Sequence, residues 1–159
     1  MPRTVYHYTS AFAAVSIVRS GRLKDLRNFK NPKIFFTESR TWDGGANRVS
    51  FANGVRREIG FDEIREALGA VRFVTTTAGL RLFWECVDER LVRPRSNVSE
   101  NADPRQWWLW LGGDYLLSRC SGFEIHDGYR WQPGTRRELY EAGPQTMGQY
   151  LAAMRQLGL

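Results

Sequence analysis

Short strand-type and helix-type segments alternate along the chain from its first residues, and this order constrains the fold more than any other feature. Val5–Tyr8 has strand composition, residues 9–21 carry apolar side chains at helical spacing, and residues 33–39 (KIFFTES) again have strand composition. No segment repeats, and no linker divides the chain. A length of 159 residues is sufficient for one hydrophobic core. The sequence therefore predicts one α+β domain over residues 1–159.

The later segments continue this alternation. Residues 41–54 contain three glycines and two asparagines, so they predict a long irregular loop. Residues 80–92 fit a helix or a strand equally well. The other expected elements are a helix at residues 61–68, a strand at 70–78, a hairpin at 120–131 and one or two helices after residue 135.

Composition excludes two broad classes of protein. Hydrophobic residues make up 42% of the chain and aromatic residues 13%, which is too apolar for a disordered protein. No apolar run approaches the roughly 18 residues of a membrane span, so no membrane partner is expected. Cys86 and Cys120 show neither CxxC nor Cys/His ligand spacing, so no metal is expected. The first residues lack a secretory signal, which predicts a cytoplasmic protein.

Positive charge is concentrated in the first 60 residues. They hold eleven Lys and Arg against four Asp and Glu, whereas residues 61–159 hold twelve against thirteen. A coding bias toward arginine and a basic face that meets phosphates both fit this pattern. On the second interpretation, Arg27, Lys30 and Lys33 would contact nucleic acid, and an acidic protein is the alternative partner.

The first strand has an unusual sequence, Tyr-His-Tyr-Thr at Tyr6–Thr9. A helix ending in Ser-Gly-x-Leu follows it, and then the strand FFTESR at Phe35–Arg40. This order resembles the opening of the ADP-ribosyltransferase superfamily, which the DNA-targeting ADP-ribosyltransferase toxins and the RNA 2′-phosphotransferases share. The resemblance covers roughly residues 1–45. It implies an α+β fold with an ADP-ribosyltransferase-like split β-sheet and flanking helices, and it implies NAD as a co-substrate.

The resemblance also implies which residues would bind NAD. His7 would hold the ribose hydroxyls, because a neutral imidazole offers one donor and one acceptor. Backbone groups next to it, such as those of Thr9, would hold the nicotinamide amide. An aromatic ring would stack on the nicotinamide, and the candidates are Tyr8, Phe36 and Trp42. Tyr8 is bulkier than the glycine that the family usually has after the histidine.

Charged residues complete the expected site. The guanidinium of Arg40 suits a pyrophosphate or the reacting ribose, and Arg72 is a second candidate. Cleavage of the nicotinamide–ribose bond develops oxocarbenium character, which a carboxylate stabilises. Glu124, on a short strand between apolar residues, is the expected catalytic carboxylate, and Glu85 is the rival.

Together these features predict an NAD-dependent mono-ADP-ribosyltransferase that modifies nucleic acid or a nucleic-acid-associated protein. No Glu-x-Glu or Gln-x-Glu pair of the arginine-modifying enzymes stands at the expected place, so arginine is not the expected acceptor. Two alternatives remain. One is a non-catalytic nucleic-acid- or protein-binding effector on the same fold, and the other is an enzyme of the RNA 2′-phosphotransferase type.

Overall fold

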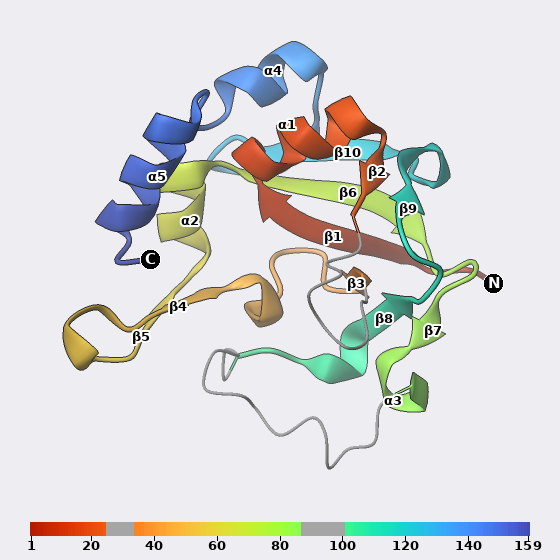
Figure 1. Ribbon diagram of the computed structural model, residues 1–159. Coiled ribbons are helices and arrows are strands. Elements are labelled where there is room, and N and C mark those ends of the chain that lie inside the picture. Colours follow the sequence, from red (N-terminus) through yellow and green to blue (C-terminus); the bar gives the residue numbers. More distant parts are fainter. Residues whose placement is uncertain (25–33, 87–100) are drawn as a thin grey trace.

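A seven-stranded antiparallel sheet forms the centre of the computed structural model, which describes residues 1–24, 34–86 and 101–159 (Figure 1). The strand order across the sheet is β11-β10-β6-β1-β3-β8-β7, so strands distant in sequence are neighbours. Helices pack beside this large sheet, which is compatible with the predicted α+β class. The seven strands are β1 (Thr4–Ser10), β3 (Ile34–Thr37), β6 (Ala70–Thr76), β7 (Arg81–Leu82), β8 (Trp107–Trp110), β10 (Gly122–His126) and β11 (Trp131–Pro133).

The pairing of β6 with β1 and with β10 decides which side chains share a face of the sheet. Tyr8 lies opposite Arg72, and Arg72 lies opposite Glu124. One residue away along β1, His7 lies opposite Phe73. Successive side chains of a strand point to opposite faces. The face that carries Tyr8, Arg72 and Glu124 is called the aromatic face below, and the face that carries His7 and Phe73 is called the helical face.

Helices α1 (Ala11–Ser20) and α4 (Arg136–Glu141) cover the helical face, as Figure 1 shows. The main hydrophobic core lies beneath α1 and includes Val5, Val71 and Phe73, none of which is more than 1% exposed. Burial of a side chain of this size stabilises the fold by about 1.5–3 kcal/mol. The helical face of the sheet therefore contributes the side chains of the main hydrophobic core.

Local sequence signals define the ends of the helices. Ser10 is the N-cap of α1, and its hydroxyl accepts a hydrogen bond from a backbone N–H of the first turn. Gly21 ends the same helix in the left-handed conformation, with φ of 70°. Thr135 and Thr146 each form a capping box, at the start of α4 and of α5 (Met147–Gln156). The helices predicted at residues 9–21 and in the tail are confirmed.

A second, smaller core holds the C-terminal helix against the rest of the chain. It contains Ile64 and Leu68 of α2 (Phe61–Leu68), together with Ile59 and Leu157. The helix predicted over residues 61–68 is confirmed with the same bounds. This core lies beside the end of the sheet where β1 leads into α1, so α2 and α5 flank the aromatic face (Figure 1).

The prediction of an irregular loop over residues 41–54 was wrong in part. This segment contains β4 (Arg48–Ser50), which pairs with β5 (Arg57–Ile59) in a two-stranded ribbon. The Ser50 hydroxyl donates to the Gly158 carbonyl at 2.6 Å and so attaches the ribbon to the C-terminus. Three residues of strand between glycines and asparagines have too little periodicity to predict, and their pairing partner lies outside the predicted loop.

The other predicted segments are largely confirmed. The hairpin expected at residues 120–131 is formed by β10 and β11. Residues 81–86 of the ambiguous segment start as strand β7 and continue as the short helix α3 (Phe83–Cys86), and residues 87–92 lie outside the described residues. No helix among the described residues has the length and apolar character to cross a membrane. The remaining elements are the ribbon of β2 (Arg22–Leu23) with β9 (Tyr115–Leu116), and 3₁₀ turns at Gly44–Ala46, Ala52–Gly54, Pro104–Gln106 and Leu117–Arg119.

Candidate active site

An ion pair between Arg72 and Glu124 occupies the middle of the aromatic face. The side chain of Arg72 is only 9% exposed, whereas that of Glu124 is 25% exposed. The Arg72 Nε donates to Glu124 Oε2 at 2.5 Å. Because β6 and β10 place these residues directly opposite each other, the sheet register itself brings the two charges together.

Other protein groups contact Nη1 and the guanidinium plane of Arg72. Its Nη1 donates to the Arg40 carbonyl and makes a long hydrogen bond of 3.5 Å to the Tyr8 hydroxyl. The guanidinium carbon lies 4.2 Å from the Tyr6 ring centroid and 4.7 Å from that of Trp131. A planar, weakly hydrated guanidinium suits such a position, where aromatic faces and hydrogen bonds replace water.

A cluster of aromatic side chains packs beside this ion pair, and Tyr8 and Trp131 are its members that contact Arg72. Tyr8 contacts Trp42 at 5.1 Å and Trp131 at 5.4 Å between ring centroids. Phe61, at the start of α2, lies 5.0 Å from Trp42. The centroid of the His126 ring lies 4.8 Å from that of Phe61 and 5.0 Å from that of Trp131. These five side chains, called the aromatic cluster below, are all partly buried.

The segment after β3 folds over the aromatic face through its backbone. The Ser39 carbonyl accepts from the Tyr8 hydroxyl at 2.6 Å, and the Thr41 carbonyl accepts from Trp131 Nε1 at 3.0 Å. The Arg40 carbonyl accepts from Arg72, as described above. Three consecutive carbonyls are thus held by side chains of three different strands, β1, β6 and β11.

Asp43 stabilises the turn that carries this segment. Its carboxylate accepts from the Thr37 hydroxyl at 2.7 Å, from the Gly45 N–H at 2.7 Å and from Trp107 Nε1 at 3.1 Å. Asp43 is buried. A buried carboxylate with three donors fixes the backbone on both sides of it, and this places Trp42 over Tyr8.

Two titratable side chains of the aromatic cluster, Tyr8 and His126, are neutral at pH 7. Burial raises the pKa of Tyr8 to about 12, against the opposing effect of Arg72. Burial also lowers the pKa of His126, with the positive charge of Arg65 as a smaller contribution. His126 Nδ1 accepts from the Gly128 N–H at 3.1 Å, so Nε2 carries the proton of the neutral ring. His126 is therefore a hydrogen-bond donor on the same face as Glu124, two residues further along β10.

The structure does not bring His7 and Glu124 together. His7 lies on the helical face, where its Nδ1 donates to the Phe35 carbonyl at 2.8 Å and its ring meets Phe36 edge-on. Burial lowers the pKa of His7, and this hydrogen bond opposes the shift. Because a pleated strand separates the two faces, one ligand cannot contact both side chains. The structure therefore separates His7 from Glu124, and any role of His7 in binding NAD stays a prediction.

Two other predicted NAD contacts share the face of His7. Thr9 lies two residues further along β1 and so on the helical face. Phe36 is 1% exposed and packs against Tyr115 in the main core, so it cannot stack on a ligand. For Phe36 the prediction was wrong. Of the predicted rings, only those of Tyr8 and Trp42 line the aromatic face.

The predicted charged residues separate into two groups. Arg72 and Glu124 lie at the centre of the aromatic face, and Arg40 contributes its carbonyl while its side chain is exposed. The rival carboxylate, Glu85, is exposed on α3, next to the edge strand β7 and several strands from β10. The residues predicted to contact nucleic acid, Arg27, Lys30 and Lys33, lie outside the described residues.

Sequence reasoning missed four members of the site, namely Tyr6, Phe61, His126 and Trp131. One signal could have found Tyr6, because it alternates with Tyr8 along the same strand. The others come from α2, β10 and β11, and only the folded chain shows that these elements meet.

Comparison with known proteins adds no assignment, since no protein-family model, no curated protein and no solved structure matches the chain. Among the described residues, no three His, Cys, Asp or Glu side chains gather as metal ligands. Function is therefore inferred from the chemistry of the aromatic face together with the sequence pattern of the first 45 or so residues.

Proposed function

We propose that this chain is an NAD-dependent ADP-ribosyltransferase with an ADP-ribosyltransferase-like fold, and that Glu124 is its catalytic carboxylate. One observation carries the proposal. A carboxylate that is 25% exposed is held by a buried arginine, which packs against Tyr6 and Trp131 beside the aromatic cluster. The resemblance of the first 45 or so residues to that superfamily supports the same chemistry.

In the proposed reaction the bond between ribose C1′ and the nicotinamide nitrogen breaks, and its electron pair leaves with nicotinamide. The Glu124 carboxylate stabilises the positive charge that develops at the ribose. A nucleophilic group of the acceptor then bonds to C1′, and its proton passes to the carboxylate or to water. Nicotinamide and one proton are released for each ADP-ribose transferred.

Other residues of the aromatic face would position the dinucleotide. His126 Nε2–H would donate to a ribose hydroxyl, the role predicted for His7. Trp42 or Trp131 would stack on the nicotinamide. Arg72 orients Glu124 and acts through it. The exposed guanidinium of Arg40 would meet the pyrophosphate, and the acceptor would be nucleic acid or a protein bound to it.

Replacement of Glu124 by Gln tests this assignment, because it keeps the shape of the side chain and removes its charge. NAD turnover, followed by nicotinamide release, should fall at least about a hundredfold while NAD still binds. Glu85→Gln is the matched control and should leave turnover unchanged. Circular dichroism confirms that both variants are folded. If Glu124→Gln keeps the turnover of wild type and Glu85→Gln loses it, Glu85 and not Glu124 is the catalytic carboxylate.

One observation favours a non-catalytic effector as the second candidate. Protein groups contact the Arg72 guanidinium at Nε, at Nη1 and through the Tyr6 and Trp131 rings, so an ion pair that only holds the segment of Arg40 on the sheet accounts for these contacts as well. In that case the wild type would not release nicotinamide from NAD in the presence of protein, DNA or RNA acceptors. Glu124→Gln would then lower thermal stability and have no other effect.

A further inference from the structure

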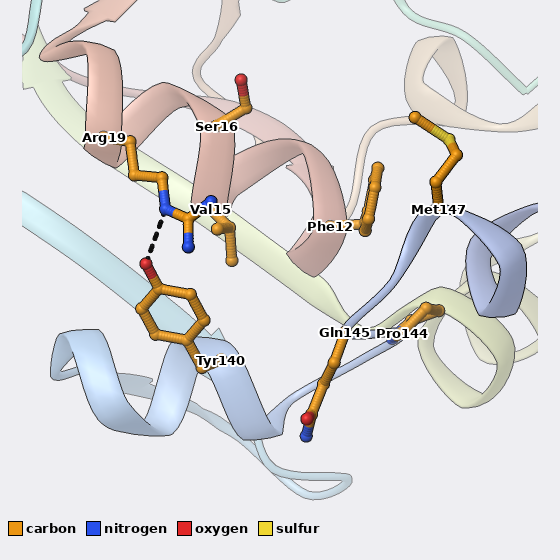
Figure 2. A pocket seen from close by; sticks show the side chains of 8 residues that line it. All are labelled: Phe12, Val15, Ser16, Arg19, Tyr140, Pro144, Gln145 and Met147. Carbon is orange, nitrogen blue, oxygen red and sulfur yellow. Dashed lines mark hydrogen bonds between the residues drawn. The ribbon is translucent and has the colours of Figure 1, made fainter.

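A cavity lies on the helical side of the sheet, opposite the face that carries Glu124. It has a volume of about 270 Å³ and opens between α1, α4 and the start of α5 (Figure 2). Phe12 and Val15 of α1 form one apolar wall, and Pro144 and Met147 form the other. Figure 2 shows Arg19 and Tyr140 together at one end of this space. Because α1 and the sheet separate it from the aromatic face, this groove is independent of the proposed active site.

The polar end of the groove presents a positive charge in a fixed orientation. Arg19 Nε donates to the Tyr140 hydroxyl at 2.8 Å, and the guanidinium carbon lies 5.2 Å from the Tyr140 ring centroid. Within the described ranges, Arg19 forms no ion pair and its two terminal nitrogens have no acceptor. A guanidinium oriented by one of its N–H groups can still bind a carboxylate through its two terminal nitrogens.

Exposed apolar side chains lie at the groove, Tyr140 and Met147, and next to it on α5, Leu151. Tyr140 is 39% exposed, Met147 58% and Leu151 48%. Met147 and Leu151 are one turn apart on α5, so they lie on the same side of that helix. Exposed Tyr, Met and Arg side chains that gather around a cavity are typical of protein interfaces.

The size and charge of the groove indicate what it binds. A cavity of about 270 Å³ is smaller than most small-molecule sites, but it is large enough for one bulky apolar side chain. The one cation at its end, on a chain with a net charge of +6, requires a negative partner. A hydrophobic side chain and a carboxylate about one turn apart on a helix meet both requirements.

We propose that this groove docks an acidic amphipathic helix of a partner protein. One large apolar side chain of that helix fills the cavity between Phe12 and Met147. An Asp or Glu three or four residues away binds the terminal nitrogens of Arg19. Tyr140 positions Arg19 and forms the floor beneath it.

Selection from a displayed library of random helical peptides on the full-length chain tests the proposal. Selected peptides should share an apolar residue with an acidic residue three or four positions away. Their dissociation constants, measured by fluorescence anisotropy, should rise at least about tenfold in Arg19→Gln and in Met147→Gln. Both side chains are exposed, so these variants are expected to fold, and circular dichroism checks this.

Arg155→Gln is the matched control, since it removes an exposed arginine of α5 that does not line the groove. It should leave peptide affinity within twofold of wild type. When the acidic residue of the peptide is replaced by Gln, wild-type affinity should fall and Arg19→Gln should cause no further loss.

Three results would overturn the proposal. One is that the selected peptides carry no acidic residue near the apolar one, or that no peptide is selected. Another is that Arg19→Gln and Met147→Gln bind the selected peptides as tightly as wild type does. The third is that wild-type chains pair through this groove in analytical ultracentrifugation and Met147→Gln separates them, which would assign the groove to self-association.

Discussion

Replacement of Arg72 by Met tests the energetic role of the Arg72–Glu124 ion pair. Met has a similar length and packs well between aromatic rings, so it keeps the contacts with Tyr6 and Trp131. It removes every hydrogen bond of the guanidinium, including the one to the Arg40 carbonyl. Glu124 is then left on the sheet without its cation.

The structure sets the size of the expected effect. Removing one partner of a buried ion pair costs about 3–5 kcal/mol. Because the Glu124 side chain is 25% exposed, water can solvate it in part, which places the cost near the lower limit, at about 3 kcal/mol. With a urea slope of about 2 kcal/mol per molar, the unfolding midpoint should fall by about 1.5 M.

Urea unfolding at pH 7, followed by tryptophan fluorescence, measures this shift. In Arg72→Met/Glu124→Leu both charges are absent, so most of the lost stability should return. Arg137→Met is a matched control, because Arg137 pairs with Glu141 on the surface of α4 with its side chain 88% exposed, and its effect should stay within about 0.5 kcal/mol. The reasoning fails if Arg72→Met costs no more than this control, or if the double variant is no more stable than Arg72→Met.

Two further predictions concern the helical face. The pKa of His7 is lowered in the folded chain, so the unfolded chain binds more protons below about pH 6.5 and stability falls as the pH drops. The free energy of unfolding, measured with urea, should therefore decrease less between pH 7.5 and pH 5 in His7→Gln than in wild type. Equal decreases would contradict a lowered pKa of His7. Gly69 and Gly21 both have φ near +70°, but a Cβ on Gly69 would lie 2.3 Å from the Ala142 carbonyl oxygen, whereas one on Gly21 meets nothing within 4 Å. Thermal unfolding should show Gly21→Ala costing about 1 kcal/mol and Gly69→Ala at least 2 kcal/mol more, and equal costs would exclude a close approach at Gly69.

The elements with strong local signals could be predicted from the sequence, and their contacts could not. The helix at residues 61–68 follows from its apolar spacing, and the hairpin at 120–131 follows from alternation around a turn. The ribbon of β4 with β5 has only three residues in each strand, and its glycines and asparagines resemble a loop. Its stability comes from contacts with the C-terminus, such as that between Ser50 and Gly158, which no local pattern shows.

In the candidate site, too, single residues could be predicted from the sequence, whereas their contacts could not. Tyr8, Arg72 and Glu124 were each identified from their own segments, but only the register of three strands places them side by side. His7 was predicted to bind NAD in the same site as Glu124, but the structure places it on the other face of the sheet. It alternates with Val5, which lies in the main core, so the alternation already indicates the helical face once the position of Val5 is known.

The attachment of residues 39–41 to the sheet has a consequence for how this segment can change during evolution. Each of the three residues is anchored through its carbonyl oxygen, a group that every amino acid has. Substitutions at Ser39, Arg40 and Thr41 can therefore vary the chemistry displayed beside Glu124 while the anchoring groups on β1, β6 and β11 stay the same. The side chains of Arg40 and Thr41 can therefore change without loss of these three hydrogen bonds, whereas a change at Ser39 would also remove the hydrogen bond from its hydroxyl to the Trp42 carbonyl.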